Sequence, residues 1–339
     1  LEDKTPSYND TYQSDDDLDP KIVKILSDAL VNNIHMFNVQ VVGYGLNNTQ
    51  WLSKDNLSDH QPLVEEYLQS RAQNKADLSK FNMLLPETEA EFISITNTVD
   101  DIGCPENFTY IDKNIYSDDI PRPCTPLHFC ECVGECGNNC VCVRESYYDA
   151  NGKVQVDRHV PLMECGPKCK CGDNCSTRVV QWGSKTKFEI YRSLFKGWGV
   201  RAAQFIGKGT FIAEYVGEVI TFEEAEKRGS EDTAAGLTYL FDLDMAYTYG
   251  ASADFSIDAK TYGNISHFFN HSCDPNMEIR QVFIEHRDPR LHRLAFFSTR
   301  DIDSGEELTF GYSPSASDEG TVSFDCHCGS NICRGRINF

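Results

Sequence analysis

The chain has 339 residues, and its 31 Lys plus Arg against 52 Asp plus Glu give a formal net charge of -21. Such a chain can form two or three domains with buried cores, and its acidic balance suits a cationic peptide better than a phosphate backbone, so direct DNA binding is not expected. No apolar run approaches the roughly 18 residues of a membrane helix, and no basic-then-apolar leader opens the sequence, so we expect neither membrane insertion nor export.

The first hundred residues contain two apolar patterns at helical spacing but no chemical motif. Residues 1–19 are polar and rich in Asp, which predicts a disordered acidic tail. Asp19 and Pro20 then offer an N-cap and a first-turn proline for a helix over 20–37, and a second apolar stripe predicts a helix over 61–74. We therefore expect a helical region over 20–103, whose apolar stripes serve packing rather than cofactor binding.

From about residue 104 the sequence becomes rich in cysteine, and from about 188 it alternates between short strands and turns. Strands are predicted over 215–218, 239–244, 294–298 and 308–312. Between them, Thr221 and Glu224 form a capping box, Gly229 is placed to end the helix that they start, and a loop is expected over 229–237. The absence of a long strand-helix alternation predicts an α+β, mainly β fold.

Nine of the 15 cysteines lie in two dense blocks between Cys130 and Cys175. The blocks are Cys130, Cys132, Cys136, Cys140 and Cys142, then Cys165, Cys169, Cys171 and Cys175. Thiols without an export signal stay reduced and are natural zinc ligands, although redox thiols or disulfides are an alternative. Two separate tetrahedral sites would leave one thiol unused, whereas three zinc ions are all four-coordinate if three cysteines each bridge two metals. The blocks therefore predict a structural three-zinc cluster.

A second set of thiols lies near the end of the chain. Cys326, Cys328 and Cys333 supply three ligands, and Cys273 is the candidate for the fourth ligand of a tetrahedral zinc site. If Cys273 is that ligand, the end of the chain folds back onto its middle. The two remaining cysteines, Cys104 and the one at position 124, are expected to be free thiols.

Four motifs occur in a fixed order in the second half of the sequence. They are Gly197-Trp198-Gly199, the Tyr-Val-Gly-Glu run over 215–218, the Asn-His-Ser-Cys-Asp-Pro-Asn run over 270–276, and the Glu-Leu-Thr-Phe-Gly-Tyr run over 307–312. With these motifs the sequence resembles the SET-domain protein lysine methyltransferases. The nine cysteines before the motifs and the three after them make it most similar to the suppressor-of-variegation 3-9 type, and the resemblance covers about residues 104–339.

The resemblance implies a domain order and a cellular role. It implies a pre-SET zinc domain over 104–185, a SET domain over 186–313 made of short curved sheets with a knot-like crossing, and a post-SET zinc tail over 314–339. It further implies methylation of lysine 9 of histone H3 in heterochromatin and gene silencing, in the nucleus, with chromatin silencing proteins as further partners. A chromodomain often precedes this region in similar proteins, but residues 1–99 show no convincing trace of one.

The aromatic residues of the predicted strands suit a lysine side chain. Alternate residues of a strand share a face, so Phe310 and Tyr312 line one surface, Tyr239 belongs to another strand, and Tyr215 adds a third source. A narrow aromatic channel packs on lysine methylenes and removes water from the nitrogen, although an ordinary aromatic core is the alternative. By resemblance, Tyr312 lies nearest the reacting nitrogen, Tyr215 and Tyr239 complete the pocket, and Phe310 implies a di- or trimethylated product.

The resemblance also implies a cofactor and a substrate. The cofactor is S-adenosylmethionine, with binding residues Lys196, Gly197, Trp198, Gly199, Tyr239, His267, Asn270, His271 and, as a weak match, Phe339. The two glycines allow close backbone approach, or they are merely turn residues. The substrate is the histone H3 tail, bound as an added strand, and Asp244 is the candidate contact for a basic neighbour of the target lysine.

Two positions depart from the family pattern. Gly311 stands where many similar proteins carry Asp, and His267 stands where many carry Arg, which puts the level of activity in question. One alternative is therefore a catalytically silent, zinc-stabilised module that binds histone tails. Another is a methyltransferase for a different lysine.

Overall fold

The computed structural model divides into two compact units, one formed by Leu1–Ala76 with Thr98–Asp101 and the other by Asp77–Asn97 with Ile102–Phe339. The structure describes residues 21–31, 34–42, 49–73, 78–121, 129–137, 140–142, 147–193, 195–234, 239–243, 253–312 and 323–338. The predicted acidic tail over 1–19 lies outside these ranges. Among the described residues, no helix is both long and apolar enough to cross a membrane.

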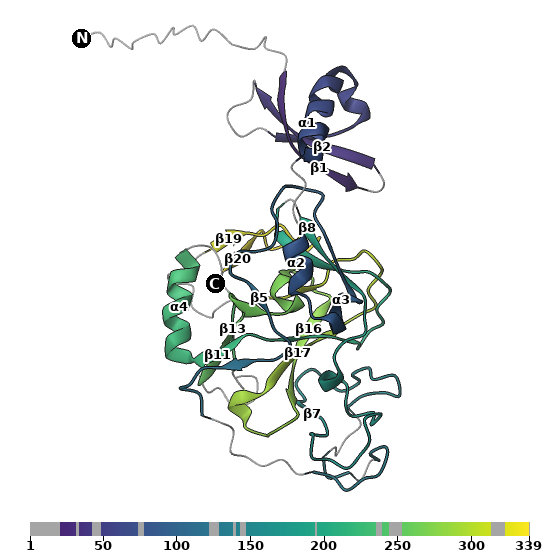
Figure 1. Ribbon diagram of the computed structural model, residues 1–339, viewed down its shortest axis with the longest axis vertical. Helices are drawn as coiled ribbons and strands as arrows, with labels where there is room; N and C mark the ends of the chain where they lie inside the picture. Colours follow the sequence, from purple (N-terminus) through teal and green to yellow (C-terminus); the bar gives the residue numbers. More distant parts are fainter. Residues whose placement is uncertain are drawn as a thin grey trace, which may run out of the picture. The chain divides into compact units, whose positions relative to one another are not determined.

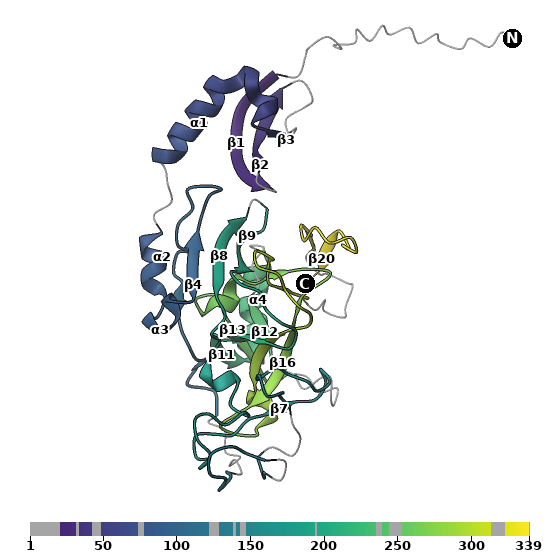
Figure 2. The ribbon, with the colours of Figure 1, turned by 90° about the vertical axis from the view of Figure 1, so that its right-hand side faces the viewer.

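The first unit is an antiparallel sheet with a helix against it (Figure 2). The sheet has the order β1 (Lys21–Val31), β2 (Ile34–Val42) and β3 (Thr49–Ser53), followed by the 3-10 helix η1 (Asp55–His60) and the helix α1 (Gln61–Gln73). Phe37, Val39 and Val41 of β2 are buried in its core, with Leu57 of η1 and Val64 of α1.

The helix predicted over 20–37 is wrong, because β1 and β2 occupy this segment and pair as a hairpin. The buried residues of β2 alternate with less buried ones, which is the period of a strand, and this period decides the structure because η1 and α1 cover one face of the sheet. The helix predicted over 61–74 is confirmed by α1. The region over 20–103 is therefore a mixture of strands and helices.

The second unit consists of several short sheets with few helices (Figure 1), which confirms the predicted mainly β fold class. It begins with α2 (Ser79–Leu84), α3 (Glu87–Ala90), β4 (Ile93–Thr96), β5 (Thr109–Tyr110), β6 (Ile115–Tyr116), β7 (Leu162–Met163), η2 (Val180–Trp182), β8 (Phe188–Ser193), β9 (Gly197–Ala202), β10 (Phe211–Tyr215) and β11 (Glu218–Thr221). It continues with α4 (Phe222–Ala234), β12 (Leu240–Asp242), β13 (Phe255–Asp258), β14 (Tyr262–Gly263), η3 (Ile265–Phe268), β15 (Asn270–His271), β16 (Met277–Phe283), η4 (Pro289–Leu291), β17 (Arg293–Ser298), β18 (Thr309–Phe310), β19 (Ser323–Asp325) and β20 (Arg336–Asn338).

Three sheets carry most of this unit, in the orders β4-β8-β9, β10-β17-β16-β7 and β12-β13-β11-β6. Strands from the cysteine-rich part of the chain close two of them, since β6 pairs with β11 and β7 pairs with β16. A small parallel pair, β15 with β18, places Asn270 opposite Thr309 and His271 opposite Phe310. This pair brings the third and fourth sequence motifs side by side.

Of the four predicted strands, two are confirmed, one is shorter than predicted and one is wrong. The strand over 294–298 is confirmed by β17, the strand over 239–244 by β12 in its described part, and the strand over 308–312 is reduced to β18. The strand over 215–218 is wrong, because the chain turns between β10 and β11. A Cβ at Gly217 would lie 2.3 Å from the backbone oxygen of Asp258, so only glycine permits this close approach.

The helix predicted from the capping box is longer than expected. The backbone N–H of Glu224 donates to Thr221 Oγ1 at 3.3 Å, which confirms the cap. The predicted end at Gly229 and the loop from 229 onward are wrong, since α4 continues to Ala234. Arg228 forms ion pairs with Glu218 and Asp258 of neighbouring strands, and this tertiary anchor holds the helix through the glycine.

Candidate active site and zinc centres

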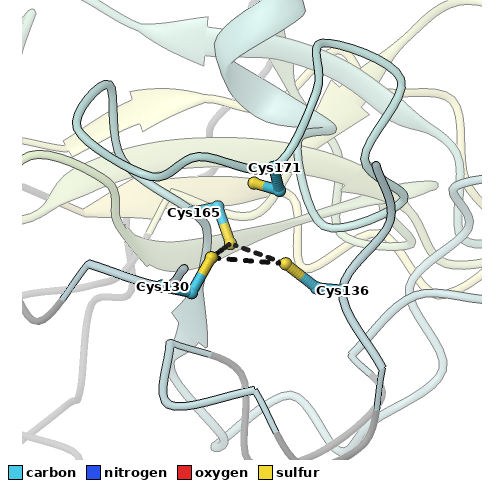
Figure 3. A group of neighbouring side chains, drawn as sticks. All are labelled: Cys130, Cys136, Cys165 and Cys171. Atoms are coloured by element: carbon cyan, nitrogen blue, oxygen red, sulfur yellow. Dashed lines mark hydrogen bonds between the residues drawn. The ribbon is translucent and has the colours of Figure 1, made fainter. Parts of the chain in front are cut away.

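The nine clustered thiols have the geometry of a zinc centre (Figure 3). The Sγ atoms of Cys130 and Cys136 are 3.5 Å apart, those of Cys136 and Cys165 are 3.5 Å apart, and those of Cys130 and Cys165 are 3.9 Å apart. Four sulfurs around one zinc at the usual bond length of about 2.3 Å lie ~3.8 Å from one another. The spacing therefore fits tetrahedral zinc.

The thiols form overlapping groups rather than separate sites. The groups are Cys130, Cys136, Cys165 and Cys171; Cys130, Cys140, Cys142 and Cys165; and Cys130, Cys132, Cys136 and Cys140. Cys130 belongs to all three groups, and Cys169 joins the array through its Sγ atom, 3.5 Å from that of Cys142. Shared thiols are what bridging thiolates require, so the predicted three-zinc cluster fits this donor set, with buried Cys175 as its ninth thiol.

The predicted second zinc site is also assembled. The sulfurs of Cys273, Cys326, Cys328 and Cys333 all lie within 4.8 Å of one another. Cys273 lies two residues after β15, so the zinc site attaches the C-terminal tail to the third motif itself. Cys104 belongs to none of these groups and donates its thiol to the carbonyl of Pro105, and position 124 lies outside the described residues.

The predicted aromatic pocket residues come together from three strands. The hydroxyl of Tyr312 donates to the backbone oxygen of Phe269 at 3.0 Å, and the hydroxyl of Tyr215 donates to the backbone oxygen of Tyr239 at 2.6 Å. The ring centroids of Phe310 and Tyr312 are 4.8 Å apart. The hydroxyls of Tyr215 and Tyr312 are thus held by backbone acceptors, and both rings pack on phenylalanine rings.

The pocket keeps its tyrosines protonated. Burial, and then the proximity of Tyr239 and Glu307, raises the pKa of Tyr312 above its ordinary value. Burial, followed by Tyr312 and other nearby acidic groups, likewise raises the pKa of Tyr215. Both hydroxyls are therefore hydrogen-bond donors whose oxygen lone pairs remain able to accept from a substrate amine.

Two of the predicted cofactor-binding residues contact the same carboxylate, that of Glu307. The side chain of Asn270 donates to the backbone oxygen of Trp198 at 3.1 Å and to Glu307 Oε1 at 3.0 Å, and Lys196 forms an ion pair with the same Glu307. A Cβ at Gly199 would lie 2.9 Å from the Asn270 amide, so this glycine is required by close packing. The sequence reasoning did not single out Glu307 as a site residue, although it opens the fourth motif.

One atom of this region fits a ligand. The indole nitrogen of Trp198 is buried and has no acceptor in the part of the chain that the structure describes. A buried donor without a partner costs about 1–3 kcal/mol, so an acceptor from a bound molecule is favoured there. The glycine-rich start of β9, the orphaned donor and the carboxylate of Glu307 together suit a polar, partly cationic cofactor such as S-adenosylmethionine.

The two predicted histidines are neutral and structural in their contacts. The Nδ1 atom of His271 accepts from the Tyr312 backbone N–H at 3.0 Å, which places its proton on Nε2, facing Cys273. The ring of His267 stacks on Tyr239 with centroids 4.3 Å apart, and its Nδ1 donates to the backbone oxygen of Ala259 at 2.7 Å. Burial lowers the pKa of His267 to about 4, so it does not supply the charge of an arginine.

Two predicted site residues, Asp244 and Phe339, lie outside the described residues. Their contacts with substrate and cofactor remain predictions.

Comparisons with known proteins find matches to both the cysteine-rich region and the region of the four motifs. A SET domain matches residues 197–313, and a Pre-SET motif matches residues 86–178. The histone-lysine N-methyltransferase SUV39H2 of Xenopus tropicalis is 38% identical over 310 residues, covering 86% of this chain and 75% of that protein. The chain belongs to the SUV39-type SET-domain methyltransferases. The resemblance carried by the four motifs is thereby confirmed.

Other members of this family are similar in sequence or structure. SUV39H2 of Homo sapiens is 38% identical over 306 residues, covering 84% of this chain and 73% of that protein. The Neurospora histone lysine methyltransferase DIM-5 has a TM-score of 0.59 at 34% identity, covering 67% of this chain and 96% of that one. KRYPTONITE, in complex with methylated DNA, an H3(1-15) peptide and SAH, has a TM-score of 0.61 at 33% identity, covering 71% of this chain and 50% of that one.

Proposed function

We propose that this protein transfers methyl groups from S-adenosylmethionine to lysine 9 of the histone H3 tail. The observation that carries the proposal is the meeting of the Tyr215, Tyr239 and Tyr312 side chains, with Tyr312 close to Glu307, the carboxylate that Lys196 and Asn270 contact. Its support is the family to which the chain belongs, whose member KRYPTONITE is described with an H3 peptide and SAH.

The pocket residues act by binding and orienting the target amine. The lysine methylenes pack on the rings of Tyr215 and Phe310, and the low-dielectric pocket favours the neutral amine by desolvation. The Tyr312 hydroxyl already donates to Phe269, so its oxygen accepts from an amine N–H and directs the nitrogen lone pair away from it. Positioning of this kind supplies much of the rate of a bimolecular transfer.

The cofactor seat is proposed to include Lys196, Gly197, Trp198, Gly199, Tyr239, His267, Asn270, His271 and Phe339, with Glu307 added from the contacts. When bound, S-adenosylmethionine supplies a methyl group on a positively charged sulfur. The carboxylate of Glu307 orients Lys196 and Asn270, and the indole N–H of Trp198 is free to donate to the ligand. These residues hold the cofactor at the end of the aromatic pocket.

The substrate is proposed to pair with an exposed sheet edge. Among the described residues β12 is the outer strand in the order β12-β13-β11-β6, so the backbone groups on its outer side can take an added peptide strand. Asp244, just beyond this strand in sequence, is the proposed contact for a basic neighbour of the target lysine. Because Phe310 adds no hydroxyl to the pocket, a partly methylated nitrogen can turn, which favours di- or trimethyl products.

The proposed location is chromatin in the nucleus, where the substrate resides, with a role in heterochromatin and silencing. The test is incubation with labelled S-adenosylmethionine and H3 tail peptides that each have one lysine blocked. Label lost only when lysine 9 is blocked supports the proposal. Equal labelling of all peptides, or tight tail binding without any transfer, contradicts it.

A further inference from the structure

Arg280 fastens a loop of the cysteine-rich region to the catalytic sheet. This residue lies in β16 with its side chain only 1% exposed. Its guanidinium donates to the backbone oxygens of Asp157 at 2.7 Å, Val160 at 3.0 Å and Val156 at 3.3 Å. A planar fork with five N–H donors can satisfy several acceptors at once, so one side chain sets the conformation of the loop.

The fastened loop forms part of a cavity. The cavity has a volume of about 350 Å³, and residues 158–161 contribute to its lining. Phe241 of β12 and Phe310 of β18, which belong to the aromatic pocket, also line it, together with Gly311. The cavity therefore adjoins the proposed lysine pocket, with which it shares Phe310, and its volume is within the usual range of ligand sites.

The charges of the cavity favour a basic peptide by a small margin. Among its described lining residues the carboxylates of Asp242 and Glu278 outnumber the one guanidinium, that of Arg158, and Asp242 belongs to β12, the outer strand of its sheet. Val160 and Pro161 of the fastened loop add apolar contact. A peptide strand paired with β12 would run past these groups on its way from the lysine pocket.

We propose that residues 158–161, held by Arg280, form a wall of the substrate-binding cavity. This wall contacts the residues that flank the target lysine in a cationic peptide substrate and so contributes to substrate specificity. The inference rests on the proposed function and extends it, because it assigns substrate recognition to the zinc-cluster region as well as to the SET strands. Arg280 is a positioning residue in this arrangement. Val160 is the contact residue, since it lines the cavity and also receives a hydrogen bond from Arg280.

The first experiment narrows the cavity and measures steady-state methyl transfer to an H3 tail peptide. Val160→Trp should raise the peptide KM about tenfold, equivalent to ~1.4 kcal/mol, while kcat and the affinity for S-adenosylmethionine stay unchanged. The matched control is Val133→Trp, a substitution in the same region at a side chain that is 91% exposed and does not line the cavity. An unchanged peptide KM in Val160→Trp overturns the inference.

The second experiment repeats these measurements with two shorter peptides, one cut close before the target lysine and one cut close after it. The effect of Val160→Trp on KM should disappear with one of the two peptides, because that peptide lacks the residues that meet the wall. An effect that persists with both peptides places the disturbance elsewhere and overturns the inference. If the wild-type protein methylates no H3 peptide, the proposed function fails instead, so the two failures are distinguishable.

The third experiment releases the loop without altering the cavity lining. Arg280→Met should raise KM for the full peptide but not for the shorter peptide on which Val160→Trp has no effect. The zinc content should stay unchanged. Arg280→Lys keeps three N–H donors and should recover part of the loss. A fall in kcat that is equal for all peptides would assign Arg280 a merely structural role and overturn its positioning role. This outcome decides the matter even if Val160→Trp does not fold.

Discussion

The Tyr312 hydroxyl donates a hydrogen bond to the backbone oxygen of Phe269 at 3.0 Å, so a residue just after β18 is tied to the chain just before β15. A hydroxyl oxygen that donates its proton keeps lone pairs with which it can accept a hydrogen bond. We expect Tyr312→Phe to lower kcat about a hundredfold or more, because the amine loses its orienting acceptor.

Labelled methyl transfer to the H3 peptide measures this effect. The matched control is Tyr148→Phe, since Tyr148 is also buried and also makes a hydrogen bond, to Glu164 at 2.9 Å, but lies in the core around the zinc cluster. Comparable losses of kcat in both variants would contradict a direct role of Tyr312.

Phe310 controls the room around the methylated nitrogen. Its ring packs on Tyr312 at 4.8 Å and on Phe296 at 5.0 Å, so a hydroxyl added at its edge would reach the pocket. We expect Phe310→Tyr to shift the product toward monomethyl lysine, because the new hydroxyl can hold a water and restrain the nitrogen. An unchanged product distribution by mass spectrometry would refute this.

The tail zinc site depends on Cys273, the one ligand outside the C-terminal block. Cys273→Ala should lower the metal content by one zinc per chain and weaken S-adenosylmethionine binding, because the closing tail loses its attachment behind β15. Elemental analysis and cofactor titration measure both effects. Cys104→Ala is the control, since Cys104 belongs to no metal group of the described residues, and a loss of zinc there would contradict the assignment.

Glu214 makes stability depend on pH. It is buried beside Arg293, with Oε2 3.1 Å from a guanidinium nitrogen, and burial raises its pKa to about 7 despite the opposing effect of Arg293. The folded state therefore keeps a proton that the unfolded state releases near the ordinary glutamate pKa of 4.5. The free energy of unfolding should fall as the pH rises through this window, by up to about 1.4 kcal/mol per unit.

Urea unfolding at several pH values between 5.5 and 7.5 tests this. Glu214→Gln cannot titrate, so the wild-type stability relative to this variant should decrease by ~2 kcal/mol up to about pH 7 and then level off. Parallel curves for the two proteins would show that Glu214 is already charged in the folded state.

Gly311 and Gly217 should respond oppositely to the same substitution. At Gly311 an added Cβ meets only the Pro275 side chain at 3.9 Å, so Gly311→Ala should stabilise by about 0.4–1 kcal/mol through the unfolded state. At Gly217 the Cβ would overlap the Asp258 backbone, so Gly217→Ala should destabilise by about 1–3 kcal/mol. Thermal unfolding distinguishes the two, and a loss of stability at Gly311 would contradict the open space there.

The amino-acid sequence alone was sufficient for the zinc ligands, the order of the motifs and the class of fold. Thiols at short spacing, such as those from Cys326 to Cys333, can share one metal with little dependence on the rest of the fold, and the family motifs are continuous runs. For the same reason the capping box at Thr221 was readable, since its donor and acceptor are three residues apart.

Outside the zinc sites, the tertiary structure decided the features that join distant segments. The segment over 20–37 forms strands because β3 extends the sheet and α1 covers its apolar face, and α4 passes Gly229 because Arg228 is anchored to strands. Glu307 and Arg280 have no local signature either, because their partners lie on other segments of the chain. Local spacing specifies ligands and periodicity, whereas the contacts of a buried charge depend on which strands the folded chain brings beside it.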